Sequence, residues 1–171
     1  MPRIRTIALA DAPALADLQQ SNRAFLAPWE PLRSDEHYTA AGQSAVITGL
    51  LEAQASGQCA AFVILDDEGR VAGQITLSGI VRGALQSCAV GYWLAEPASG
   101  HGFATQALEE AVQHAFDELD LHRVQAEALP ANIASLRVLA RCGFTVYGLA
   151  PQYLRIAGQW QDCLMLQRLA D

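Results

Sequence analysis

Lysine is absent from this chain, and cations are scarce altogether. All eleven basic residues are arginines, against eighteen acidic residues, so the formal net charge is −7. Affinity for nucleic-acid phosphates comes from clustered cations, and this balance therefore disfavours a direct nucleic-acid binder. An acidic chain attracts a basic protein or an amine more readily.

Long apolar runs and clustered cysteines are also missing. No apolar stretch is long enough to span a bilayer, and the beginning MPRIRT lacks the apolar core of a signal peptide. We therefore expect a cytoplasmic protein that does not associate with membranes. The four cysteines stand far apart, without C-x-x-C and without a Cys/His pair at metal-ligand spacing, so we expect free core thiols and no metal site.

The chain has the size and composition of one ordinary globular domain, 1–171. Its 171 residues are 51% hydrophobic and 17% charged, which allows a real core and excludes a disordered or disulfide-dense chain. We find no internal repeat, low-complexity tract or long linker. The sequence does not fix the oligomeric state, and a homodimer stays open.

Strand and helix patterns are interleaved irregularly along the chain. Strands are expected over 3–9, 59–65, 70–80, 86–94, 122–129, 144–149 and 163–169. Helices are expected after Asp11, from Asp35 to Gly57, over 103–119 and over 132–142, with an irregular loop over 27–35. This order favours an α/β or α+β domain around one mixed sheet.

The most informative local feature is a glycine-rich turn between the strand ending at Leu94 and the helix beginning at Phe103. Gly100 and Gly102 lack a Cβ, so the backbone can turn tightly and a ligand can approach its N–H groups. The first helical turn adds unpaired donors and the positive end of the helix dipole. The pattern indicates an anion site, most plausibly for a pyrophosphate, although the glycines could serve only the turn.

Two other phosphate motifs do not fit. A P-loop needs a lysine, which this chain lacks. The dinucleotide fingerprint needs a third glycine inside a parallel βαβ unit, whereas that position is Thr105 and the preceding strands look antiparallel.

A second segment, 129–144, follows the glycine turn. Its Asn132 and Ser135 lie three residues apart on one helical face, where Asn132 alone would suit an N-cap. A strand, G-x-G-x-A, a helix, a strand, an N-x-x-S helix and Gly-Phe together resemble the GNAT superfamily of acyl-CoA-dependent N-acyltransferases. The segments 92–94, 132–135, 138–139 and 158–162 are similar to the Rim-type branch, and the segments 22–31 and 81–83 most closely resemble the ribosomal-protein alanine N-acetyltransferases.

The resemblance implies a fold and a cofactor site. The fold would be a central mixed, mostly antiparallel twisted sheet, splayed at the acyl-CoA site and flanked by helices on both faces. The implied acetyl-CoA contacts are Trp93, Leu94, Ser99, Gly100, His101, Gly102, Phe103, Ala104, Thr105 and Asn132. Two positions depart from the superfamily pattern. Ser99 stands where Arg or Gln is usual, and Leu139 stands where many members carry a Tyr that acts as the general acid and protonates the departing thiolate. In the Rim-type branch the serine of N-x-x-S takes that Tyr's role, which here is Ser135.

The implied reaction is direct attack of a neutral amine on the acetyl-CoA thioester, with Ser135 donating to the departing thiolate. Backbone N–H groups near Trp93 and Leu94 would polarise the carbonyl. An α-amine has a pKa near 8, so only modest help from a base is needed. Cys142 has no histidine at a recognisable spacing, so an acyl-enzyme on it has little support.

On the acceptor side the resemblance points to Trp29 and Glu30 on a loop, and to Arg82 as a contact for substrate. Glu30 could hold or deprotonate the amine, or it could be a solvated loop residue. The expected acceptor is a protein N-terminus, possibly ribosomal and basic. Two alternatives stay open: acetylation of a small amine such as an amino acid, polyamine or antibiotic, and an acyl-CoA-binding module without catalysis.

Overall fold

The computed structural model describes residues 2–170, which form a single sheet of seven strands in the order β1-β2-β3-β4-β5-β7-β6. Every neighbouring pair is antiparallel except β4 and β5, which are parallel. The strands are β1 (Ile4–Thr6), β2 (Ala60–Leu65), β3 (Val71–Val81), β4 (Ser87–Leu94), β5 (Arg123–Ala128), β6 (Thr145–Ile156) and β7 (Gln159–Leu169).

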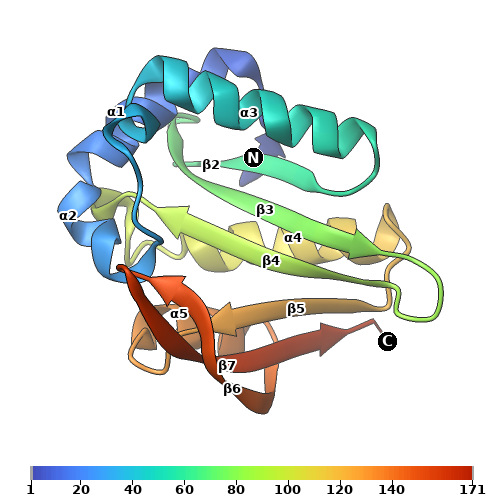
Figure 1. Cartoon of the computed structure of the whole chain (residues 1–171). Helices are drawn as coiled ribbons and strands as arrows, with labels where there is room; N and C mark the ends of the chain where they lie inside the picture. The colour runs from blue at the N-terminus through green and yellow to red at the C-terminus, as the bar shows by residue number, and fades with distance from the viewer. Residues whose placement is uncertain (1, 171) are drawn as a thin grey trace.

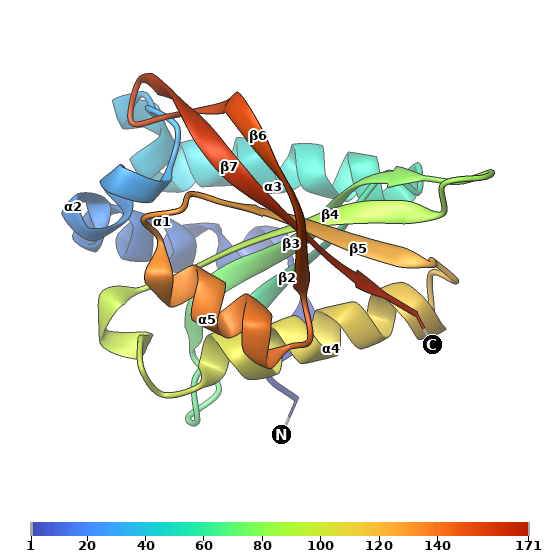
Figure 2. The ribbon, with the colours of Figure 1, turned by 90° about the horizontal axis from the view of Figure 1, so that it is seen from below.

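Helices cover both faces of this sheet (Figure 1). They are α1 (Ala12–Ser21), α2 (Arg23–Leu26), α3 (Ala40–Ala55), α4 (Phe103–Asp117) and α5 (Ile133–Arg141). Figure 2 shows α1 and α3 on one side of the sheet, with α4 and α5 on the other. The predicted mixed, mostly antiparallel sheet with helices on both faces is thus confirmed. No helix within residues 2–170 has the length and apolarity that a membrane crossing would need.

Strand β2 explains why two helical layers form. All six of its residues are buried, so it must cover an apolar core on each face. Successive side chains of a strand point to opposite faces. Phe62 and Ile64 accordingly pack in the core under α4, whereas Ala61 and Val63 pack in the core under α1 and α3.

The sheet opens between its two parallel strands. β4 and β5 are in register only from Ser87 to Ala89 and from Arg123 to Gln125, after which they diverge. The amide of Ala95 donates to the carbonyl of Ala72, and neighbouring residues of a strand direct their polar groups to opposite sides. The N–H and C=O groups of Tyr92 and Leu94 therefore face the opening toward β5, while those of Trp93 are used in pairing with β3.

Local structure corrects three of the predicted boundaries. Helix α3 begins after Thr39, whose side chain accepts from Gly42 N at 3.0 Å, and Asp35 instead opens a separate 3-10 turn. The loop over 27–35 begins with another 3-10 turn. Strands β6 and β7 form one long hairpin because a bulge between Ala150 and Leu154 absorbs the irregular part of the sequence.

Candidate active site

One cleft of about 660 Å³ lies at the opening between β4 and β5. Its walls come from the glycine turn and the first residues of α4, the ends of β4 and β5, helix α5, and the loop after α2. Nearly all the predicted site residues line it: Trp29, Glu30, Trp93, Leu94, Ser99, Gly100, Gly102, Phe103, Ala104, Thr105, Asn132 and Ser135. The fold thus brings the predicted cofactor and acceptor segments to one cleft.

The glycine turn has the backbone conformation that its composition predicts. Gly100 and Gly102 both have φ of +83°, a left-handed conformation that side chains with a Cβ rarely adopt. A Cβ at Gly100 would meet nothing within 4 Å, and one at Gly102 only Gln106 Nε2 at 3.8 Å. The turn is therefore open on its outer side. Gly102 is the N-cap of α4, so the free N–H groups of that helix begin at the turn.

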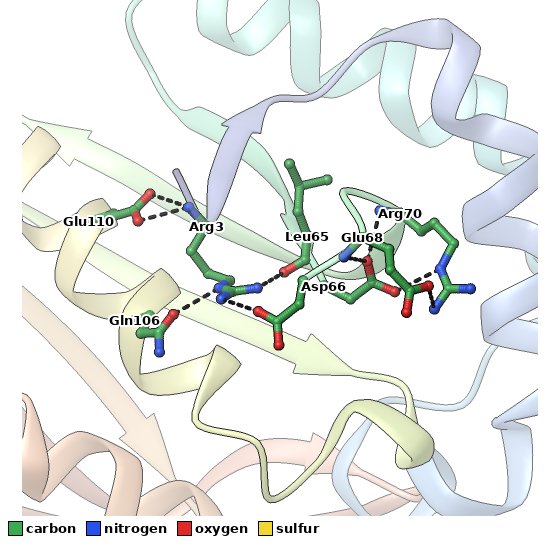
Figure 3. A network of polar contacts seen from close by, with 8 residues as sticks. Arg3, Leu65, Asp66, Glu68, Arg70, Gln106 and Glu110 are labelled. Carbon is green, nitrogen blue, oxygen red and sulfur yellow. Dashed lines mark hydrogen bonds and ion pairs between the residues drawn. The ribbon is translucent and has the colours of Figure 1, made fainter. Parts of the chain in front are cut away.

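Arg3 holds the start of α4 in place (Figure 3). Its guanidinium lies 4.3 Å from the centroid of the Phe103 ring, and its Nε donates to Gln106 Oε1 at 2.9 Å. The same side chain donates to the carbonyl of Leu65, and its backbone N–H donates to both carboxylate oxygens of Glu110. The first turn of α4 is thereby joined to β1 and to the end of β2. The residues that form this support are far apart in the chain, so no local sequence pattern indicates it.

Helix α5 presents a hydroxyl to the cleft. Asn132 caps the helix, with its Oδ1 accepting from Ser135 N at 3.1 Å. This leaves the Ser135 side chain free of a capping role, and its Oγ lies 3.0 Å from Tyr92 Oη. Burial raises the pKa of Tyr92 to about 12, although the contact with Ser135 acts in the opposite direction. Tyr92 is therefore a protonated phenol near neutral pH.

Glu30 is half-buried and lines the cleft from the loop that follows α2. Burial raises the pKa of its carboxyl, against the opposing effects of Arg33 and a hydrogen bond from Gln19. Gln19 itself is buried, and its Oε1 has no hydrogen-bond partner within the described part of the chain. The loop is fixed by a backbone bond from Ala157 N to Glu30 O at 2.9 Å, which ties it to the β6–β7 turn.

A second carboxylate in the cleft, Glu127, is not among the residues that the sequence predicted. It lies on β5 across the opening from β4, and burial raises the pKa of its carboxyl as well. In the sequence Glu127 occupies an exposed-looking position in an alternating strand, so only the divergence of β4 and β5 shows that it faces a cleft.

Arg82 and His101 do not line this cleft. Arg82 lies in the β3–β4 connection, at the other end of β4 from the glycine turn, where it donates to the backbone carbonyl of Leu119. The ring of His101 stacks on Phe103 with 5.5 Å between centroids. Cys142 is buried, and its burial raises the thiol pKa to about 12, which makes it a poor nucleophile.

Comparison with known proteins places this architecture in a class. Residues 3–145 match the acetyltransferase (GNAT) domain family, and the chain belongs to it. It is an acetyltransferase of the GNAT type, close to the ribosomal-protein N-acetyltransferases.

Particular relatives support this placement. A probable N-acetyltransferase of Bacillus subtilis, YjcK, is 37% identical over 162 residues, covering 93% of this chain and 88% of that protein. The ribosomal protein uS5-alanine N-acetyltransferase of Escherichia coli is 36% identical over 160 residues, covering 93% and 82%. The structure of Mycobacterium smegmatis RimJ in complex with CoA-disulfide superposes with a TM-score of 0.94 at 33% identity, covering 98% of this chain and 81% of that one.

Within residues 2–170, no group of three or more His, Cys, Asp or Glu side chains could hold a metal ion. Cys59, Cys88, Cys142 and Cys163 are all buried free thiols.

Proposed function

We propose that this protein transfers the acetyl group of acetyl-CoA to the N-terminal α-amine of a basic protein, such as a ribosomal protein. The observation that carries the proposal is that one cleft of about 660 Å³ is lined by the glycine turn and α4, by Ser135, and by the proposed acceptor loop with Trp29 and Glu30. The Escherichia coli relative is a ribosomal protein uS5-alanine N-acetyltransferase, which supports a protein acceptor.

The glycine turn suits the pyrophosphate of CoA. Its outer side is free of side-chain atoms near Gly100, and α4 adds free N–H groups and a positive dipole end. Ser99 contributes less than an arginine would, because its hydroxyl is a neutral donor without the positive charge of a guanidinium. When bound, acetyl-CoA supplies an acetyl group activated as a thioester.

The opening in the sheet suits the thioester. The backbone N–H of Leu94 faces the opening, whereas that of Trp93 is used in pairing with Gln74. Of the two predicted carbonyl-polarising donors, Leu94 is therefore the one we propose. Ser135 Oγ is the proposed donor to the sulfur that leaves.

Two carboxylates can receive the proton of the amine. Buried carboxyls with raised pKa values are better proton acceptors than exposed ones, and Glu30 and Glu127 both meet this description. We propose that Glu30 holds the incoming amine, because it lies on the loop at the acceptor side, and that Glu127 takes up the proton at the opening between the strands.

A competition assay tests the acceptor. Peptides that begin with Ala and continue with basic residues are mixed with free amino acids, polyamines and aminoglycosides, and mass spectrometry counts the acetylated products. The net charge of −7 favours basic peptides through attraction that salt weakens. Preferential acetylation of a small amine would contradict the protein acceptor, and CoA binding without any transfer would contradict catalysis.

A further inference from the structure

A tyrosine on β4, Tyr92, places its hydroxyl next to Ser135 in the cleft. The position in α5 where many superfamily members were expected to carry a Tyr is Leu139, which is buried. Tyr92 on β4 instead brings its Oη to within 3.0 Å of Ser135 Oγ and 3.4 Å of the Ser135 carbonyl. These two residues lie 43 positions apart in the chain and come from opposite walls of the opening.

We propose that Tyr92 is a positioning residue, which donates its hydroxyl hydrogen to Ser135 Oγ and so leaves the serine hydrogen free to point at the sulfur of CoA. The inference rests on the proposed function only for the identity of the group that receives the serine hydrogen.

The direction of the Tyr92–Ser135 bond follows from the chemistry of the two hydroxyls. A phenol is a stronger acid than an aliphatic alcohol, so in a pair of this kind the phenol is the better donor. Of the two acceptors within reach of Tyr92, the serine Oγ is the nearer. Burial keeps the phenol protonated across the neutral range, so this donor persists while the serine works.

A serine near the start of a helix needs such a partner. Serine hydroxyls in helices often turn back to donate to a carbonyl of the preceding turn, which would use up the hydrogen. A hydrogen bond accepted from Tyr92 fixes the Oγ on the side of β4. It also polarises the serine O–H, because donors in a chain strengthen one another. The serine hydrogen then has the cleft as its free direction.

The test measures the pKa of the thiol of bound CoA, which requires no acceptor amine. Thiolate absorbance during a pH titration of the CoA complex reports this pKa in the wild type, Tyr92→Phe, Ser135→Ala and the double variant. Tyr147→Phe is the matched control, since it removes a hydroxyl that accepts from Gln125 Nε2 on the exposed side of β6. The kcat of acetyl transfer is measured for the same variants with the best acceptor peptide.

A hydrogen bond from Ser135 stabilises the thiolate, so the thiol of CoA bound to the wild-type protein should have a lower pKa than the thiol of free CoA. Ser135→Ala should cancel this shift, and Tyr92→Phe should cancel part of it. The kcat of Tyr92→Phe should fall about tenfold, the effect of one hydrogen bond to a group that gains charge, at an unchanged Kd for CoA. The double variant should match Ser135→Ala, because Tyr92 acts through the serine. Tyr147→Phe should match the wild type.

Several outcomes would overturn the inference. If CoA bound to Tyr92→Phe has the same thiol pKa as CoA bound to the wild type, the Tyr92 hydroxyl has no role. If the thiol pKa is also unchanged in Ser135→Ala, Ser135 does not donate to the thiolate and Tyr92 cannot act through it. Additive effects in the double variant would make Tyr92 independent of Ser135. Weaker CoA binding with an unchanged thiol pKa would reduce Tyr92 to packing. If instead the thiol shifts follow the expected pattern while no peptide is acetylated, the proposed acceptor fails and the inference stands.

Discussion

Replacing Gly102 by valine should separate the CoA site from the fold. Gly102 caps α4 at φ +83° and ψ 0°, a conformation that a β-branched residue adopts only under strain. A Cβ there would meet only Gln106 Nε2 at 3.8 Å, so steric contact with the protein is not the problem. The valine must either keep the strained turn and project its side chain into the open space assigned to the pyrophosphate, or relax the turn and displace the N–H groups of the turn and of the start of α4.

The size of the effect can be worked out from this geometry. A strained backbone of this kind costs about 1–3 kcal/mol, which lowers the melting temperature of a chain of this size by about 3–10 °C. The α4 face that includes Leu108, Ala111 and Val112 stays buried, so the fold should persist. CoA at 100 times its Kd stabilises the wild type by about 2.7 kcal/mol, or roughly 5–10 °C, and the variant should lose this gain.

Thermal unfolding with and without CoA is the assay, and Gly57 provides a matched control. Gly57 follows α3 with φ +72°, and a Cβ there would meet nothing within 4 Å. Gly57→Val should therefore carry the same backbone penalty yet keep the full CoA-induced shift. A Gly102→Val variant that binds CoA as tightly as the wild type would refute the assignment of the turn to the pyrophosphate.

Three further predictions concern the cleft and its support. Ser135→Ala should lower kcat by about 100-fold with little change in the Kd for CoA, and an unaltered kcat in steady-state assays would exclude donation to the sulfur. Glu30→Gln should lower acceptor kcat/KM by about tenfold or more while acetyl-CoA affinity measured by calorimetry stays constant; a selective loss of that affinity would place Glu30 on the wrong side of the cleft. The pKa of Asp11 is lowered mainly by its hydrogen bond from Arg5, so its stabilising effect is present above its unfolded pKa of about 4 and disappears as the pH falls through the lower folded value. Asp11→Asn should thus cost about 1 kcal/mol in urea unfolding at pH 7 and nothing at a pH well below the folded pKa of Asp11, whereas an equal loss under both conditions would contradict the linkage.

Local sequence patterns predicted most of the secondary structure, because the forces behind them are local. The apolar face expected for the helix over 103–119 contains Leu108, Ala111, Val112 and Ala115, all of which are buried in α4. The glycine turn was predictable because its backbone needs residues without a Cβ. The long β6–β7 hairpin was only partly predicted, since its register shifts twice, once at Gly148 and once around Pro151, and each shift interrupts the alternation.

The functional contacts outside the two motifs depend on how distant segments meet. Nothing near Tyr92 in the sequence indicates Ser135 as its partner, and nothing near Glu127 shows that β5 leaves β4 at that point. Asp35 and Thr39 are both good helix caps, and only the bond to Gly42 distinguishes them. Arg82 directly follows a strand, as predicted. It nevertheless lies in the β3–β4 connection, at the end of β4 opposite the glycine turn.

The divergence of β4 from β5 has a consequence for amide hydrogen exchange. Along the second half of β4, the amides of Gly91 and Trp93 are bonded to β3, whereas those of Tyr92 and Leu94 face the opening without a strand partner among residues 2–170. Protection should therefore alternate from one residue to the next within a single strand, an unusual pattern for a strand near the middle of a sheet. A ligand that supplies its own carbonyl groups to this edge would make the protection uniform while the fold around it stays unchanged.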